Sequence, residues 1–367
     1  MLFRLIAMAK SIRFGTKIFR CRKENTVLVL FALIMCIATA VFCRQAVEVN
    51  SRIEDNKVFY RKLIEKYGGK YSETKDRKLL NEEKTADIEE RYKQSMLLKQ
   101  YYGAADEDDV YEATKNMLYD RNSISSLAYV RQQMEYAKKD VAKREIIYQN
   151  GWIELFNRNY LFYVPVLWSV LLTSVFFSID YGNGMYTLSG TFEYGGRHIY
   201  FARVSNSLLV GCGLYVVTVM VRLITVYTRY GLGSRNVHLQ SVTLFQDSTL
   251  SVNLLSAYLI SVFIGITGMF FINAFTVLVC TLLKNAIKVF VTVIISVATT
   301  TVIPGKGVYY TGWGMIRPMN YIAGIKGKMN DELKYMSQEE VTVAIIIALT
   351  STVILYYVGS VLYEKNY

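Results

Sequence analysis

The chain has 367 residues, of which 52% are hydrophobic and 20% are charged, with a formal net charge of +12. These averages conceal a division, because residues 44–158 hold 22 of the 42 Lys and Arg and 21 of the 30 Asp and Glu. That hydrophilic insert carries +1, and the other residues carry +11. The pattern indicates a membrane protein with one soluble insert, and it argues against nucleic-acid binding, which needs a basic face on a soluble module.

Residues 1–25 predict an amphipathic helix that lies on the cytoplasmic surface of the membrane. Its basic residues are three or four positions apart and share one helical stripe: Lys10, Arg13, Lys17 and Arg20. Such a stripe binds an anionic leaflet, and the alternative is a basic tail without structure. Residues 26–43 are almost entirely apolar and predict the first transmembrane helix. The positive charge before this helix places the N-terminus in the cytoplasm.

Residues 44–158 then fall outside the cytoplasm and predict a helical, partly coiled domain. They contain no proline, and one run of apolar residues steps by three and four over two heptads: Leu127, Val130, Met134, Ala137 and Val141. The acidic run at 106–109 lacks the ligand spacing of an EF-hand. We therefore interpret it as a solvated turn rather than a calcium site.

Residues 159–367 predict five further transmembrane helices, at about 160–178, 204–226, 253–278, 286–304 and 341–363. Lys284 and Lys288 mark the turn between the fourth and fifth spans of the whole chain as cytoplasmic. The connections at 227–251 and 305–340 are then external, with a partial return of the latter into the membrane left open. Arg222, near the outer end of its span, is expected to snorkel to the headgroups. The prediction is an all-α plasma-membrane protein with six transmembrane helices and both termini in the cytoplasm.

No catalytic, metal or cofactor site is apparent in the sequence. The only histidines, His198 and His238, fall on opposite sides of the membrane in this topology. The chain has no GxxxxGK[ST] loop and no GxSxG elbow. We expect a protein that is not itself an enzyme, and any ATP that drives it would bind a partner chain.

The most informative stretch is the short polar interval at 178–203, between the second and third predicted spans. Asp180 ends one span and Arg203 begins the next, with an Arg-His pair at Arg197 and His198. The residues of interest within the interval are Asp180, Gly182, Gly184, Glu193, Arg197 and Arg203. The glycines allow the chain to turn sharply at both ends of the interval, as they would also in an ordinary cytoplasmic connection.

This interval, together with the order of the spans, resembles the membrane subunit of ABC-2-type ABC transporters. In that family an acidic residue ends the second span, and glycine, small polar residues, arginine and a further basic residue follow. Asp180, Gly182 or Gly184, residues 189–191, Arg197 and Arg203 match this order, although the family more often has Glu and Lys at the two ends. The usual proline before the arginine is replaced by Gly196. The external sequences at 230–232 and 239–241 resemble those of Firmicute members with long inserts.

The resemblance implies that the 178–203 interval docks on a separate ABC ATPase subunit. It further implies a dimer of permease subunits, embedded in membrane lipids, that exports a peptide, lipid or other amphipathic compound. The alternative from a different class is a membrane sensor or scaffold that transports nothing and binds a ligand or protein through its insert. The 11 tyrosines between Tyr60 and Tyr148 suit such a recognition surface, although tyrosine is also common in ordinary helical cores.

Overall fold

The computed structural model describes residues 57–101, 126–157, 162–182, 197–302, 306–318, 320–323, 325–326, 333–334 and 336–365, with isolated positions between 34 and 41. The isolated positions in the predicted first span are helical and exposed: Ile34, Ile37, Ala38 and Val41. The amphipathic helix predicted for residues 1–25, the acidic run at 106–109 and the centre of the 178–203 interval lie outside the described residues.

The chain divides into two compact units. One, here called the bundle unit, contains Met1–Gln45, Phe156–Thr225 and Tyr258–Tyr367. The other, the insert unit, contains Ala46–Leu155 and Val226–Ala257. The hydrophilic insert therefore does not fold alone, because the connection between the third and fourth predicted spans belongs to the same unit.

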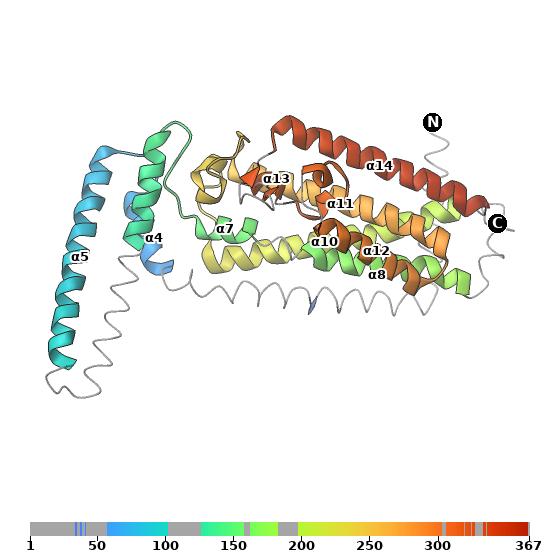
Figure 1. Ribbon diagram of the computed structural model, residues 1–367, viewed down its shortest axis with the longest axis horizontal. Coiled ribbons are helices and arrows are strands. Elements are labelled where there is room, and N and C mark those ends of the chain that lie inside the picture. Colours follow the sequence, from blue (N-terminus) through green and yellow to red (C-terminus); the bar gives the residue numbers. More distant parts are fainter. Residues whose placement is uncertain are drawn as a thin grey trace. The chain divides into compact units, whose positions relative to one another are not determined.

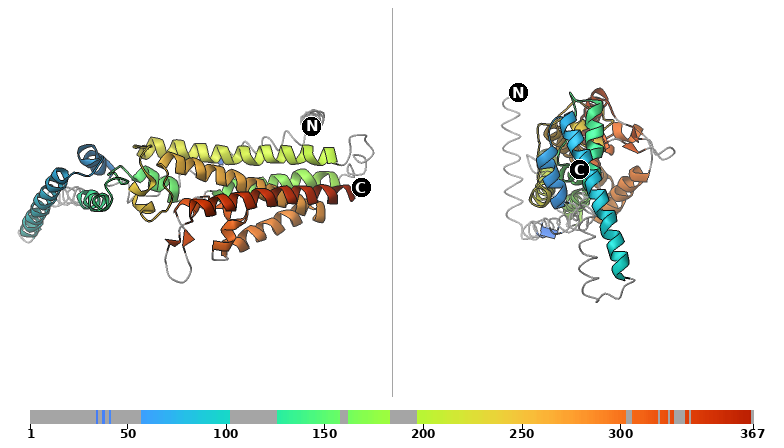
Figure 2. Two further views of the ribbon diagram at one scale, coloured as in Figure 1. Left: turned by 90° about the horizontal axis from the view of Figure 1, so that it is seen from above. Right: turned by 90° about the vertical axis from the view of Figure 1, so that its left-hand side faces the viewer.

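The described part of the bundle unit is built from long apolar helices that lie side by side (Figures 1 and 2). These helices are α8 (Tyr163–Gly182), α10 (Arg197–Tyr230), α11 (Leu254–Leu283), α12 (Ala286–Val302) and α14 (Gln338–Lys365). Each predicted span in residues 159–367 coincides with one of them. Asn285 begins α12 as its N-cap, since its Oδ1 accepts hydrogen bonds from the backbone N–H of Ile287 and Lys288, each at 3.1 Å.

Three of these helical segments are long and apolar enough to cross a membrane, judged by length and composition: Ile199–Tyr230, Leu254–Leu283 and Gln338–Lys365. Two shorter segments, Tyr163–Ser178 and Ala286–Thr300, are also apolar. An isolated antiparallel pair, β1 (Ile325–Lys326) with β2 (Leu333–Lys334), is the only sheet among the described residues. The all-helical class is thus confirmed in its coarse form, and the three long helices indicate a multi-pass membrane protein.

Glycines bring the bundle helices into close contact. A Cβ atom on Gly265 of α11 would lie 1.9 Å from the hydroxyl oxygen of Tyr215 on α10. A Cβ on Gly359 of α14 would lie 2.3 Å from the hydroxyl oxygen of Tyr200. Small residues permit such approach, which is how membrane helices pack without a hydrophobic driving force between them.

A buried asparagine joins four of the bundle helices. Asn273 on α11 donates from Nδ2 to Thr173 Oγ1 of α8 at 3.2 Å and to Ser207 Oγ of α10 at 3.0 Å. Its Oδ1 accepts a hydrogen bond from the Tyr356 hydroxyl of α14 at 3.0 Å. Both ends of the amide are therefore satisfied, as a polar group surrounded by apolar helices requires.

Arg222 differs from the expectation that it snorkels to the membrane surface. Its side chain is only 2% exposed, and its guanidinium carbon lies 5.4 Å from the centroid of the Phe162 ring. The face of an aromatic ring attracts a cation, so the guanidinium stays inside the bundle unit. The prediction was wrong because the Phe162 ring, which contacts the guanidinium, is distant in sequence and could not be identified as its neighbour.

The insert unit consists of short helices around a mixed apolar and polar core. Its elements are α4 (Lys57–Tyr67), α5 (Glu73–Tyr101), a helical stretch at 126–139, the start of α7 (Asn150–Asn157), and the 3-10 turns η2 (Leu239–Ser241) and η3 (Thr243–Phe245). The predicted seam is confirmed for the four residues that are buried: Leu127, Val130, Met134 and Ala137. It is wrong for Val141, which is 43% exposed because the helix ends before it.

Gln149 joins the two chain segments of the insert unit. Its Nε2 donates to the backbone carbonyl of Ser241 at 2.8 Å, and its Oε1 accepts from both the N–H and the hydroxyl of Thr243 at 3.0 Å. Beside it, the buried Tyr60 hydroxyl donates to the Ile147 carbonyl at 2.8 Å and accepts from the Gln149 N–H at 3.1 Å. Residues 226–257 are therefore held by specific hydrogen bonds rather than forming a free loop.

Helix α10 ends inside the insert unit. Gly231 follows its last residue with φ +77°, the left-handed conformation that commonly terminates a helix. Arg61 on α4 donates from a terminal guanidinium nitrogen to the Tyr230 carbonyl at 2.7 Å. Its guanidinium carbon also lies 5.4 Å from the centroid of the Tyr148 ring. A cation at a helix C-terminus interacts favourably with the helix dipole, so Arg61 stabilises this end of α10.

Candidate functional site

The first candidate is the end of the bundle that carries the 178–203 interval. Phe177 near the end of α8 lies 6.2 Å, centroid to centroid, from Tyr200 near the start of α10, and Tyr200 lies 5.4 Å from Tyr363 near the end of α14. Helices α11 and α14 run in the same direction, because Ile264 packs in one cluster with Ala344, and Asn273, later in α11, is hydrogen-bonded to Tyr356, later in α14. The last residues of α8, α11 and α14 and the first residues of α10 and α12 are therefore at one end.

This end, here called the basic end, carries an excess of positive charge. Its basic residues are Arg197, Arg203, Lys284, Lys288 and Lys365. The acidic residues in the same stretches of sequence are Asp180, Glu193 and Glu364. Lys284 adopts φ 53° in the tight turn between α11 and α12.

The predicted docking residues are only partly within the described residues. Asp180 lies in the last turn of α8, and Gly182 is the last residue of that helix. Arg197 is the first residue of α10, and Arg203 is half-buried in its second turn. Gly184 and Glu193 lie outside the described residues. The structure thus brings the end of α8 and the start of α10, which flank the interval, to the same end of the bundle. The role of these residues in docking stays a prediction.

The second candidate is the segment between α12 and α14, which the sequence placed outside the membrane with a partial return left open. It contains the 3-10 turns η4 (Lys306–Tyr310) and η5 (Gly314–Ile316) and the short helix α13 (Asn320–Ala323). Trp313 packs edge-on against Phe271 and Phe275 of α11, at centroid distances of 5.2 and 4.8 Å. Because it turns back onto the side of α11, this segment is here called the re-entrant segment.

Glycines allow the re-entrant segment to lie directly on α11. A Cβ on Gly312 would lie 2.1 Å from Cγ of Phe271, and a Cβ on Gly268 would lie 2.8 Å from the carbonyl carbon of Met315. The contacts on α11 at 268, 271 and 275 follow one helical face, eight residues short of the helix end at Leu283. Irregular backbone at such depth occurs in membrane proteins where it is buried against protein or lines a cavity.

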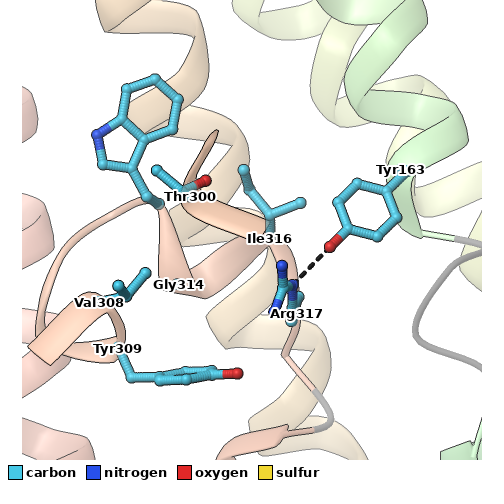
Figure 3. Close-up of a pocket in the computed structure, with 8 residues that line it drawn as sticks. Tyr163, Thr300, Val308, Tyr309, Gly314, Ile316 and Arg317 are labelled. Carbon is cyan, nitrogen blue, oxygen red and sulfur yellow. Dashed lines mark hydrogen bonds between the residues drawn. The ribbon is translucent and has the colours of Figure 1, made fainter. Parts of the chain in front are cut away.

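A small cavity opens between the re-entrant segment, α8 and α12 (Figure 3). Its volume is about 10 Å³, and its lining residues are Tyr163, Thr300, Val308, Tyr309, Trp313, Gly314, Ile316 and Arg317. The half-buried Arg317 points toward α8, where its Nε donates to the Tyr163 hydroxyl at 2.5 Å. Among the residues that the structure describes, no carboxylate pairs with Arg317.

Hydrogen bonds fix the walls of this cavity. Asn320 donates to the Tyr309 hydroxyl at 2.7 Å, and the buried Tyr321 hydroxyl donates to the Tyr309 carbonyl at 2.5 Å. Glu340 is held in a capping box at the start of α14, where it accepts from the Ser337 N–H at 2.8 Å and its own N–H donates to the Ser337 hydroxyl at 3.2 Å. It also accepts a hydrogen bond from Tyr310 at 2.9 Å.

Sequence reasoning missed Arg317 and Tyr163 as a pair. Tyr163 was not singled out as a site residue within the span predicted at 160–178, and Arg317 was not singled out within 305–340. The density of glycine and aromatic residues around Trp313 was the available signal for a packed segment. Across the described ranges from residue 57 to residue 365, no group of three or more His, Cys, Asp or Glu is placed to hold a metal ion.

No family model, no curated protein sequence and no solved structure matches this chain.

Proposed function

We propose that this protein is the membrane subunit of an ATP-driven exporter of the ABC-2 type, which works with a separate ATPase. The observation that carries the proposal is the short connection from α8 to α10 at the basic end of the bundle. Phe177 and Tyr200 hold the two helices together just before and just after it. A soluble ATPase that changes shape on binding ATP needs a short connection to move the helices, and residues 178–203 are here called the handle.

The charge distribution supports a cytoplasmic position for this handle. Basic residues concentrate on the cytoplasmic side of membrane proteins, and the basic end carries Arg197, Arg203, Lys284, Lys288 and Lys365. In the proposed topology, residues 26–43 and the five bundle helices make six spans, with both termini in the cytoplasm. The insert and residues 226–257 then face the same outer side, which agrees with their membership of one unit.

Helix α10 gives the proposed exporter a continuous mechanical element. It has 34 residues without a break, so it is about 51 Å long at 1.5 Å per residue, against about 30 Å for the hydrocarbon core. Its first residue, Arg197, belongs to the handle, and its last, Tyr230, is held by Arg61 in the insert unit. In the proposal, a displacement of the handle moves α10, because Arg197 is the first residue of this helix.

The test replaces residues 183–196 with a Gly–Ser linker of equal length in the tagged full-length protein. We expect the wild type to co-purify from its native membranes with an ATPase whose ATP turnover depends on this chain. The linker variant should still insert but should lose that dependence. The matched control is a Gly–Ser replacement of residues 327–332, between β1 and β2, which should retain it. An unchanged ATPase dependence in the first variant would exclude the proposal.

The second candidate function is a sensor or scaffold that binds a ligand through the insert unit. The observation that favours it is the built polar core around Tyr60 and Gln149, which ties the insert to residues 226–257. Deleting residues 50–150 alone would expose the buried Leu239, Val242 and Phe245 of this second segment. A deletion that separates the two functions must therefore remove both segments and join α10 to α11 by a short linker.

A further inference from the structure

We propose that the Arg317 cavity binds a phosphate group, as carried by an anionic lipid headgroup, at the end of the bundle opposite the basic end. The proposal concerns a binding site and does not depend on whether the protein is an exporter. It starts from an arginine that a hydrogen bond holds in place and that no carboxylate among the described residues neutralises.

The position of the cavity follows from α8. Tyr163 is the first residue of this helix, and Gly182, at its other end, belongs to the basic end. Arg317 donates to the Tyr163 hydroxyl, so the guanidinium lies at the level where α8 starts. Tyr309 lines the same cavity beside Arg317, and tyrosines gather at the level of lipid headgroups, whereas Trp313 closes the cavity on its deeper side, against Phe271 and Phe275.

The charge of Arg317 has no counter-ion within the described protein. An arginine cannot be deprotonated in a protein, and inside a membrane protein it normally pairs with an acid or a backbone carbonyl. The guanidinium has five N–H donors; the Tyr163 hydroxyl accepts from the one on Nε, and the Tyr309 hydroxyl also interacts with the group. The terminal nitrogens therefore have donors left for an anionic acceptor, and a phosphate matches the planar fork of the guanidinium.

The size of the cavity sets how the ligand binds. A volume of about 10 Å³ is close to the minimum for one water molecule, so it admits one oxygen atom and not a whole phosphate. One phosphate oxygen would enter between Arg317 and the aromatic wall, and the rest of the group would stay outside. The hydrogen bonds from Asn320 and Tyr321 to Tyr309 hold that wall in place before the ligand arrives.

The test measures lipid binding to the purified full-length protein by native mass spectrometry, with phosphatidylglycerol and phosphatidylcholine as probes. We expect phosphatidylglycerol to bind more tightly than phosphatidylcholine. Arg317→Gln should weaken phosphatidylglycerol about tenfold, which corresponds to about 1.4 kcal/mol. The control Lys288→Gln removes an exposed cation at the basic end and should leave binding at this site unchanged. Equal binding by the wild type and Arg317→Gln, or equal losses in both variants, would overturn the proposal.

A second measurement covers the case in which Arg317→Gln does not fold. Trp313 lines the cavity, so lipids with brominated chains should quench its fluorescence more when their headgroup is phosphatidylglycerol than when it is phosphatidylcholine. Trp313→Phe should remove this difference, and Tyr163→Phe, which leaves Arg317 in the chain, should reduce it. The same quenching by both lipids in the wild type would contradict a headgroup site.

The source of the phosphate is decided by competition. Sodium phosphate at millimolar concentration should not displace phosphatidylglycerol from the wild type if the ligand is a lipid. Displacement by inorganic phosphate that is lost in Arg317→Gln would assign the same chemistry to free phosphate. Displacement that is equal in the wild type and Arg317→Gln would overturn the assignment to this cavity.

Discussion

Two kinds of contact hold together distant parts of the chain, one described in the bundle unit and the other in the insert unit. In the bundle unit, glycines such as Gly265 and Gly268 let aromatic side chains and backbone lie directly against a helix. In the insert unit, a buried glutamine, Gln149, makes hydrogen bonds to a segment that is far away in the sequence. The contacts at Gly265 and Gly268 therefore depend on the absence of a side chain, and the contacts of Gln149 depend on the pairing of a polar one.

This difference determines what each unit tolerates. Substitution of a glycine in such a contact destabilises the fold by overpacking, because the added side-chain atoms meet backbone or rings that can move only at a cost in free energy. A polar contact fails when one partner is removed, because the other is left buried without a hydrogen bond. The following predictions test this comparison from the largest expected effect to the smallest.

The largest effect is expected for Gln149→Leu in the insert unit. The substitution leaves the Ser241 carbonyl and two donors of Thr243 without their partner, and each such group costs about 1–3 kcal/mol, so we expect a loss of about 3–4 kcal/mol. Hydrogen exchange of residues 126–149 in the full-length protein measures this loss. The control Gln246→Ala changes an exposed side chain and should have no measurable effect. Equal exchange in both variants would contradict the role of Gln149.

The next effect is expected for Gly268→Val in the bundle unit. The new Cβ would meet the backbone of Met315 at 2.8 Å, so the re-entrant segment must move, at a cost of about 2–3 kcal/mol. Thermal unfolding in detergent, followed by Trp313 fluorescence, reports this change. The control Gly213→Ala adds a Cβ that meets nothing within 4 Å and should be neutral or slightly stabilising. A lower melting temperature for Gly213→Ala than for Gly268→Val would refute the overpacking account.

A smaller effect is expected for Asn273→Leu. It removes hydrogen bonds to α8, α10 and α14, but hydrogen bonds between membrane helices contribute only about 0.6–1.7 kcal/mol each, and leucine fills most of the space. We expect the free energy of unfolding in detergent to fall by about 1 kcal/mol. This loss is smaller than the loss of free energy expected for Gln149→Leu. A larger loss for Asn273→Leu would reverse the comparison between the two units.

The smallest effect is a dependence on alkaline pH in the insert unit. Burial raises the pKa of the Tyr148 phenol to about 12, above the ordinary tyrosine value of 10.0. A raised pKa means that the neutral phenol stabilises the fold below the unfolded value and that this contribution is lost as the pH rises through the folded value. Limited proteolysis of the insert unit should therefore increase between these two pH values. Tyr148→Phe, which cannot ionise, should show a smaller increase; an identical increase would assign the effect to another group.

The sequence was sufficient to predict the helices but not most of their contacts. Hydropathy alone locates α11 and α14, since long apolar runs have few other solutions. The heptad seam from Leu127 to Ala137 was also visible, because its spacing follows the helix period. Its extension to Val141 failed where the helix ended.

The contacts that could not be predicted join residues that are distant in sequence. The sequence around Arg222 does not indicate that its guanidinium will lie over the Phe162 ring. The sequence around Arg317 does not indicate that it will donate a hydrogen bond to Tyr163. Gln149 belongs to the hydrophilic insert, and the Ser241 and Thr243 that it binds were assigned to a separate external connection. Local patterns specify the period of a helix, whereas these pairs depend on which helices become neighbours.

The most direct test of the proposed function is photo-crosslinking from the α8–α10 connection in intact cells. A photoreactive amino acid at Ser189 should capture an ATPase that carries a Walker motif, because that position lies within the proposed handle. The same group at Ser234, in the insert unit, should capture none. Capture of the ATPase from Ser234 alone, or labelling of a cysteine at position 189 by an impermeant reagent added outside the cell, would contradict the account.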